Sequence, residues 1–264
     1  MVDAGVARAA RVYDYLLGGT VNFVVDREAA VHVAGAVGGL DVARTIVRAN
    51  RDFLGEVVRH LAAEVGVRQY LDIGTGIPAR GNVHEVAQRA VPEARVVYVD
   101  YDPIVLAYSH RLLDSTPEGA TAYVHGDLRD PEPILAQAAA TLDFGQPIAL
   151  VLIGALHFIR DAEDPYAIVA RLMEAVPSGS YLAISHLAGD LQATEMAEMA
   201  ERYDDSVDEA MVVRSHAEVS RFFDGLELVG PGVVTIDRWE GSDTDTDPPE
   251  GWVMPVYGAV GRKP

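Results

Sequence analysis

The stretch Leu71-Asp72-Ile73-Gly74-Thr75-Gly76 decides the fold. It is typical of a short buried strand that ends in Gly-x-Gly ahead of a helix, where a ligand can approach the backbone closely. Similar apolar runs follow at residues 94–99, 120–124, 148–153 and 180–185. Helix-like segments separate them at residues 82–90, 103–113, 131–140 and 165–176. Five strands that alternate with helices predict an α/β fold built on a parallel sheet.

The sequence ahead of this alternation has a different character. Residues 1–66 contain helix-like segments at 6–17, 26–37 and 41–65, and Asp26 is placed to cap the second of them. These segments predict a helical N-terminal extension, at residues 1–66, before an α/β domain at residues 67–264.

The regular alternation also stops after residue 185. We expect a long acidic helix at 188–211, a helix at 216–223 that opens with the capping box Ser215-His216-Ala217-Glu218, and two last strands at 226–229 and 256–260. The loop at 241–251 contains Asp243-x-Asp245-x-Asp247, which begins like a calcium loop. Pro248 and Met254 stand where that loop needs Gly and Glu, so we expect no metal site.

The composition limits the classes of function. The chain has 264 residues, no cysteine and a formal net charge of −19. Such a charge repels nucleic acid and anionic membrane surfaces, and the lack of cysteine excludes thiolate nucleophiles and cysteine metal ligands. Residues 1–18 hold no apolar stretch of signal-peptide length, and the longest apolar run, 148–156, is short for a membrane span. We therefore expect a cytoplasmic protein with no membrane or nucleic-acid partner; a homo-oligomer stays an open alternative.

Acidic residues follow three consecutive predicted strands. Asp72 lies inside the first strand, Asp100 and Asp102 end the second, and Asp127 follows the third. Because the carboxyl ends of parallel strands meet at one edge of a sheet, we expect these carboxylates to lie together. Pro78 removes one backbone N–H that a pyrophosphate would need. The pattern favours S-adenosyl-L-methionine, a sulfonium cation without phosphate, over NAD.

On these and other motifs the sequence resembles the class I, Rossmann-like S-adenosylmethionine-dependent methyltransferases, and within them an actinobacterial group long catalogued as a domain of unknown function. The motifs are Ala10–Gly19, Asn22-Phe23, Asp26-Arg27-Glu28, Arg48-Ala49-Asn50-Arg51, Leu71–Pro78, Val97–Pro103, Asp127–Pro131, Leu156-His157-Phe158, Arg221–Leu226 and Tyr257–Pro264. The resemblance implies a seven-stranded, mostly parallel sheet with helices on both faces and an antiparallel last strand. Ala79-Arg80-Gly81 departs from it, because members usually carry a small hydroxyl residue after the proline.

With the resemblance, the strand ends give a set of expected cofactor contacts. They are Asp72, Gly74, Thr75, Gly76, Asp100, Tyr101, Asp102, Asp127, Leu128, Gly154 and Ala155. The N-terminal segment has two interpretations. It is a lid in which Tyr13, Tyr15 and Asn22 hydrogen-bond the cofactor or substrate, or a helix that packs its tyrosine rings on the sheet and ends at Gly18.

Methyl transfer from a sulfonium needs proximity and alignment more than covalent help. His157, after the fourth strand, and His186, at the end of the fifth, are candidate bases if the acceptor must lose a proton. The alternative is that each is a neutral histidine hydrogen-bonded at a strand end.

The sequence argues against two classes of methyl acceptor. Cytosine C5 methylation needs a cysteine, and the turn Gly154-Ala155-Leu156-His157 lacks the Asn/Asp-Pro-Pro-aromatic sequence typical of amino-methylation of DNA bases. Met196, Met199 and Met211 could line an apolar acceptor pocket, or could be ordinary helix-packing residues. We therefore expect an S-adenosyl-L-methionine-dependent methyltransferase that acts on a small molecule by direct in-line displacement.

Two alternatives stay open. The chain could be a non-catalytic S-adenosyl-L-methionine-binding regulatory protein, because no base is clearly specified. The second alternative is an NAD-dependent oxidoreductase, because the glycine motif together with Ala79 also fits G-x-G-x-x-A.

Overall fold

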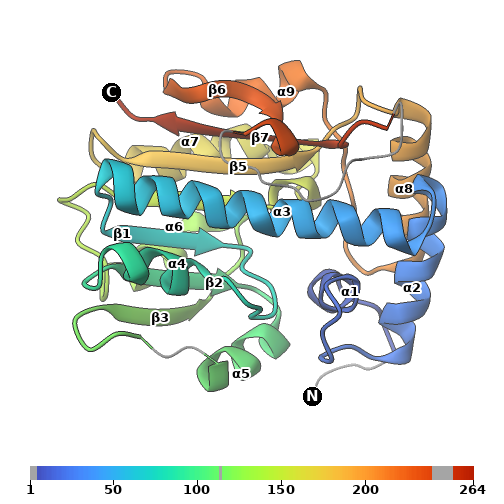
Figure 1. Cartoon of the computed structure of the whole chain (residues 1–264), viewed down its shortest axis with the longest axis horizontal. Helices are drawn as coiled ribbons and strands as arrows, with labels where there is room; N and C mark the ends of the chain where they lie inside the picture. Colours follow the sequence, from blue (N-terminus) through green and yellow to red (C-terminus); the bar gives the residue numbers. More distant parts are fainter. Residues whose placement is uncertain (1–4, 113–114, 240–251) are drawn as a thin grey trace.

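A seven-stranded sheet runs through the centre of the computed structural model, which describes residues 5–112, 115–239 and 252–264 (Figure 1). The strands are β1 (Gln69–Ile73), β2 (Arg95–Asp100), β3 (Ala120–His125), β4 (Ala149–Ile153), β5 (Tyr181–Leu187), β6 (Glu227–Thr235) and β7 (Val256–Arg262). Their order is β3-β2-β1-β4-β5-β7-β6, and β7 runs antiparallel to both neighbours. The predicted mostly parallel sheet with an antiparallel last strand is confirmed. Its strand order reverses between β1 and β4, where open α/β sheets bind their ligands.

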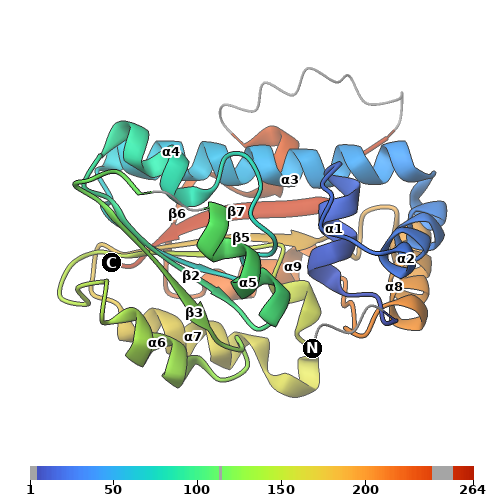
Figure 2. The ribbon, with the colours of Figure 1, turned by 90° about the horizontal axis from the view of Figure 1, so that it is seen from below.

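Helices cover both faces of this sheet. They are α1 (Ala9–Leu16), α2 (Val24–Ala34), α3 (Leu40–His60), α4 (Val83–Ala90), α5 (Pro103–Leu112), α6 (Pro131–Ala138), α7 (Pro165–Ala175), α8 (Ala193–Ser206) and α9 (His216–Ser220). Figure 2 shows α3 and α4 on one face and α6 and α7 on the other. The helices α1, α2 and α8 gather at the end of the sheet toward which β1 points, at the right of Figure 1.

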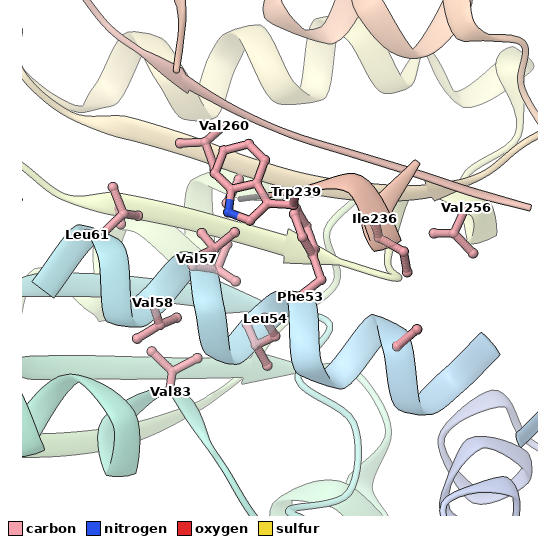
Figure 3. Close-up of a cluster of buried hydrophobic side chains, with 14 of the residues drawn as sticks. Phe53, Leu54, Val57, Val58, Leu61, Val83, Ile236, Trp239, Val256 and Val260 are labelled. Atoms are coloured by element: carbon pink, nitrogen blue, oxygen red, sulfur yellow. The ribbon is translucent and has the colours of Figure 1, made fainter. Parts of the chain in front are cut away.

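Helix α3 is fixed to the sheet by its apolar stripe. Phe53 and Val57 of α3 and Leu61, in the helical turn that directly follows it, recur every four residues, and each is at most 1% exposed. Trp239 meets Phe53 edge-on, with ring centroids 5.6 Å apart (Figure 3). Full burial of one such side chain contributes about 1.5–3 kcal/mol. The N-terminal half of α3 extends past the strands and is therefore a firmly held wall of the space beyond them (Figure 1).

Several helix boundaries differ from the prediction, and for two of them the contacts give the cause. Asp26 is not the N-cap of α2: it occupies the third position, accepts the Phe23 N–H at 2.7 Å and forms a buried ion pair with Arg11 at 3.3 Å. The long helix expected at 188–211 is only α8, because Ala188 bridges to Arg214 and Gln192 turns the chain with φ 49°.

The remaining predictions on this part of the chain have mixed outcomes. The capping box at Ser215 is confirmed, since its N–H donates to Glu218 at 2.8 Å and its side chain accepts from the Glu218 N–H. Residues 241–251 lie outside the described ranges. In the described part of the chain, no single helix is long and apolar enough to cross a membrane. Taken together, the helical segments Val24–Val37 and Leu40–Val65 have the length and composition of a membrane span, but the chain bends by 94° between them.

Candidate functional site

The turn after β1 requires its glycines. Gly74 and Gly76 have φ of 79° and 68°, in the left-handed region that favours glycine. A Cβ on Gly74 would lie 2.7 Å from the Cβ of Ala155, so the turn packs directly against the end of β4. The chain then continues as a loop to Asn82 before α4 begins. This loop contains Pro78, and its end at Asn82 agrees with the helix predicted at 82–90.

The backbone donors of this turn are already engaged. The N–H groups of Gly74 and Thr75 donate to the carbonyl of Val99 at 2.9 and 3.2 Å, and that of Gly76 donates to the Asp100 carboxylate at 2.8 Å. At the start of α4, the Gly81 N–H donates to the carboxylate of Glu85 at 2.8 Å. A pyrophosphate needs such donors free, and it would meet the Glu85 charge at the helix N-terminus. The geometry fits a ligand without phosphate.

Two buried acids lie side by side at the ends of β1 and β2. Asp72 and Asp100 are 6% and 7% exposed. Burial raises the pKa of Asp72 to about 7, although the Arg51 charge opposes the shift. Burial also raises the pKa of Asp100 to about 6, against hydrogen bonds from the backbone N–H groups of Asp102 and Gly76. A nearby cation would favour the ionised form of both groups, so the pair is suited to a positively charged ligand.

The other predicted acid stands at the rim of the same space. Asp127, after β3, accepts from the backbone N–H of Arg129 at 2.9 Å and from its guanidinium at 3.1 Å. Arg129 also donates to Glu163 at 2.6 Å and to the carbonyl of Phe158 at 2.9 Å. The arginine therefore joins the ends of β3 and β4 and fixes the orientation of Asp127.

One cavity of about 220 Å³ unites most of the predicted residues, between the strand ends and helices α1, α2, α3 and α8. Those that line it are Tyr13, Asp72, Gly74, Thr75, Gly76, Asp100, Tyr101, Asp102, Asp127, Leu128, Gly154, Ala155, His157 and His186.

Tyr15 and Asn22 do not line this cavity. The Tyr15 ring lies beneath the guanidinium of Arg44 at 5.8 Å, and the Asn22 amide donates to Asp14 at 2.8 Å. Two residues on a helix differ by about 200° in direction, so α1 cannot point Tyr13 and Tyr15 to the same side.

Tyr13 connects the N-terminal helix to the rest of the site. Its hydroxyl donates to the carbonyl of Val47 and accepts from the Asn50 amide, both at 3.1 Å. Asn50 in turn accepts from the hydroxyl of Ser185 at 2.6 Å. This chain of hydrogen bonds joins α1, α3 and β5 and holds α1 over the cavity. Gly18, with φ 84°, follows the end of α1, as expected for a packed helix, whereas Tyr13 lines the cavity, as expected for a lid.

The two candidate histidines differ in what their nitrogens do. His186 accepts from the Arg214 guanidinium at Nε2 (2.8 Å) and donates from Nδ1 to the Leu187 carbonyl (2.9 Å). Burial lowers the pKa of His186 to about 4. Its lone pair is occupied, and a role as base is not supported. His157 has no hydrogen-bond partner at Nδ1 among the residues described, and burial, with His186 and Arg214 nearby, lowers its pKa well below the ordinary value.

Four charged residues in or beside the site were not predicted as site residues: Arg129, described above, and Arg51, Glu209 and Arg214. Arg51 lines the cavity and donates to the carbonyls of Arg80 and Gly81 at 3.3 and 3.1 Å. It lies on α3 one turn from both Val47 and Leu54, at the edge of the helix face that lines the cavity, and a charge beside these apolar residues was the available signal.

Glu209 and Arg214 gave no such signal, because the segment that carries them was read as helix and loop. The buried Glu209 carboxylate accepts from the Tyr101 hydroxyl and from the Ala9 N–H at 3.1 Å, so it bridges α1 to the end of β2. Arg214 is 2% exposed and donates to the carbonyls of Leu156 and Ile159 at 3.1 and 2.8 Å, which shapes the turn after β4.

Comparison with known proteins agrees with this geometry. The family model described as S-adenosyl methyltransferase matches residues 1–264. A protein of the DUF574 family from Streptomyces avermitilis is 45% identical, with a TM-score of 0.94 over 100% of both chains. A protein from Thermobifida fusca assigned to the methyltransferases is 36% identical, with a TM-score of 0.86 over 97% of this chain and 95% of the other.

More distant structures share the fold alone. The plantazolicin methyltransferase BpumL, solved with S-adenosylhomocysteine, is 12% identical, with a TM-score of 0.53 over 96% of this chain and 95% of the other. No curated protein matches the chain. The match over the full length, together with the two similar structures, shows that the chain belongs to the S-adenosyl methyltransferase family and has the α/β fold of the class I enzymes.

Proposed function

We propose that this protein uses S-adenosyl-L-methionine to methylate a small-molecule acceptor. The observation that carries the proposal is the buried pair Asp72 and Asp100 beside a glycine turn whose N–H groups are already engaged. Such a site attracts positive charge and offers no cradle for phosphate. When bound, S-adenosyl-L-methionine supplies a methyl group activated on a positively charged sulfur.

The residues present fit the parts of this molecule. Asp100, at the end of the second strand, would accept hydrogen bonds from ribose hydroxyls. Asp72 would face the ammonium of the amino-acid part, and Arg51, whose Nε has no hydrogen-bond partner among the residues described, would face its carboxylate. Asp127 and the buried Leu128 are placed for the adenine amino group and ring.

The protein would promote transfer mainly by holding the reactants in line and apart from water. The hydrogen bonds of Tyr13 and Asn50 keep α1 and α3 over the cavity. His157 stays uncharged at neutral pH because its pKa is lowered, so it adds no repulsion to a cationic ligand and keeps a lone pair for the acceptor's proton. An in-line displacement needs no further group from the chain.

Two other expectations remain predictions. The engaged N–H groups disfavour the NAD alternative, whereas no contact in the described residues separates an enzyme from a regulatory protein that binds the same cofactor. A cytoplasmic location and the lack of a nucleic-acid partner are expected from the sequence.

Calorimetry with S-adenosylhomocysteine and NADH tests the proposal. We expect S-adenosylhomocysteine to bind and NADH not to bind. Asp100→Ala should weaken binding by about 10- to 100-fold, the effect of losing a charge-assisted hydrogen bond. Asp205→Ala, at an exposed position of α8, is the matched control and should leave affinity unchanged. Binding of NADH alone, or unchanged affinity in Asp100→Ala, would overturn the assignment of the site.

Transfer itself needs a second experiment. The protein is incubated with methyl-labelled S-adenosyl-L-methionine and fractionated small-molecule extracts, beside Asp100→Ala. Label that moves into a small molecule only with the unaltered chain supports the enzyme. Cofactor binding with no transfer to any fraction supports the regulatory alternative.

A further inference from the structure

Helix α3 divides the cavity into two parts of different chemistry. The residues of α3 that line it are Ala43, Ile46, Val47, Asn50, Arg51 and Leu54, which form one face of the helix. The face is apolar in its first turns and turns polar at Asn50 and Arg51. With a rise of about 1.5 Å per residue, Ala43 and Arg51 lie roughly 12 Å apart along the axis. Arg51 acts on Asp72, so the part beside Ala43 and Val47 is remote from the acid pair.

The remote part is walled by apolar side chains from several helices. The cavity is lined, besides Ala43 and Val47, by Leu16 of α1, Val33 and Ala34 of α2, Met199 of α8, and Met211, and α1 and α2 both pack against α3. Of the three methionines singled out from the sequence, Met196 is buried in the core and does not line it. We call the part lined by α1, α2, α8 and residues 43–47 of α3 the apolar compartment.

The charged side chains that line the cavity in the described ranges lie elsewhere. Most of them come from the strand ends and the loops after them, and Arg51 lies at the polar end of α3. Glu209, which follows α8 in the sequence, also lines the cavity, but its carboxylate already pairs with Tyr101, Ala9 and Arg8. A charged ligand group in the apolar compartment would lose its hydration and gain no partner of opposite charge.

A polar junction separates the two parts. A Cβ on Gly154 would lie 3.2 Å from the Asn50 amide nitrogen and 3.7 Å from Cε1 of His157, so these three residues pack together at the end of β4. The Asn50 side chain is bonded to Tyr13 and Ser185. His157 is 9% exposed, and its Nδ1 is without a partner in the described chain. Of the side chains at the junction, His157 is the one with a ring nitrogen, Nδ1, that has no hydrogen-bond partner in the described chain.

We propose that the apolar compartment holds the methyl acceptor, and that the acceptor is an uncharged, largely apolar small molecule whose single nucleophilic hydroxyl or amine lies beside His157. This inference rests on the proposed function. The acceptor's heteroatom forms a bond to the methyl carbon while the sulfur–methyl bond breaks and its electron pair returns to sulfur. The proton of the heteroatom passes to the His157 imidazole and from there to water.

The small residues of the compartment give it room and make it testable. Ala34 and Ala43 are among its lining residues, and we expect a leucine at either position to project into the space. Met199 and Met211 are unbranched and adapt to differently shaped ligands. Filling the compartment should therefore exclude an acceptor without disturbing the acid pair.

The first test measures binding of N-phenyl-1-naphthylamine, a neutral apolar fluorescent amine, to protein saturated with S-adenosylhomocysteine. We expect saturable binding that Ala43→Leu weakens at least tenfold, with S-adenosylhomocysteine affinity within about twofold of the unaltered chain. Ala34→Leu serves as a second, independent variant in case the first does not fold. Ala197→Leu, on the exposed side of α8, is the matched control and should change neither affinity.

The second arm compares charge. 1-Naphthalenesulfonate and 1-naphthylmethylammonium should bind at least tenfold more weakly than the neutral probe. Displacement of the neutral probe by S-adenosylhomocysteine, equal binding of the charged probes, or unchanged probe binding in both folded leucine variants would overturn the inference. If S-adenosylhomocysteine does not bind at all, the proposed function fails, while probe binding that the leucine variants weaken still shows the compartment.

Discussion

At the scale of single residues, the site depends on Asp72 and Asp100, because their buried carboxyl groups are costly to ionise until a cationic ligand binds. Both are buried, and their pKa values are raised to about 7 and about 6. A cationic ligand is stabilised by their ionised forms, so binding must displace protons wherever the free protein holds them.

This linkage predicts the pH dependence of binding. The pKa values of the two acids are raised in the free protein and lowered by the ligand. Affinity for S-adenosylhomocysteine should therefore increase as pH rises from about 5 and level off above about 7. The increase should be about tenfold per pH unit for each proton released. Asp72→Asn should bind more weakly and show a flatter profile. Calorimetry across this range, in buffers of different ionisation enthalpy, measures both affinity and proton release. An affinity that falls with rising pH would contradict the assignment.

The histidines should differ in stability measurements. His186→Ala removes the acceptor of the buried Arg214 guanidinium, a loss of about 1–3 kcal/mol in the free energy of unfolding. In His157→Ala no hydrogen bond of Nδ1 is lost, so the free energy of unfolding should fall by less than in His186→Ala. Urea unfolding of both variants measures the difference. Equal losses would show that His157 is as structural as His186.

Some site residues could be predicted from the sequence because strand ends are local features. Asp72 lies near the end of an apolar run, Asp100 ends one and Asp127 follows one, and the parallel sheet brings these positions together. Glu209 could not be predicted, because its importance comes from meeting Tyr101, a residue 108 positions away. For His186 the sequence left open a base and a neutral histidine hydrogen-bonded at a strand end, and its contacts with Arg214 and Leu187 agree with the second.

At the scale of elements, the apolar runs located the strands of the sheet, because most of these strands are buried runs. The exception is β6, which covers residues 227–235 instead of 226–229 and contains no fully buried residue. Helix ends were harder, because side-chain hydrogen bonds and long-range pairing decide them. Asp26 sits inside α2, where it accepts the Phe23 N–H, and the bridge from Ala188 to Arg214 keeps the chain extended ahead of α8.

The glycine turn after β1 makes a prediction at this scale. Gly74→Ala adds a strained positive φ, worth about 1–3 kcal/mol, and a clash with Ala155 at 2.7 Å. Gly66 also has a positive φ, 84°, but the Cβ added in Gly66→Ala would meet open space. We expect both variants to melt at lower temperature in thermal scans and only Gly74→Ala to lose affinity for S-adenosylhomocysteine. Equal affinity in the two variants would mean that the turn does not border the ligand.

At the scale of the whole molecule, the N-terminal helices complete a site that the sheet begins. The phenylalanine–tryptophan contact and the apolar stripe anchor α3, and α3 carries both the polar junction and one wall of the apolar compartment. Glu209 joins α1 to the end of β2 through Tyr101 and Ala9. Release of a ligand from beneath α1 requires these contacts to open.

Glu209→Gln should therefore speed release of S-adenosylhomocysteine by about tenfold, because a neutral amide holds Tyr101 and Arg8 less strongly. Stopped-flow fluorescence measures the dissociation rate. Asp208→Asn is the matched control: Asp208 also pairs with Arg8, at 3.0 Å, but that pair is solvent-exposed and contributes little. A rate unchanged in Glu209→Gln would show that α1 does not control release.

The arrangement of the molecule places the cofactor at the acid pair and the acceptor beyond the junction, and one measurement tests this most directly. A crystal structure of the protein with S-adenosylhomocysteine should show the ribose at Asp100, the amino-acid part between Asp72 and Arg51, and the sulfur directed past Gly154 toward His157 and the apolar compartment. S-adenosylhomocysteine lying within the apolar compartment, or away from Asp72 and Asp100, would contradict the account.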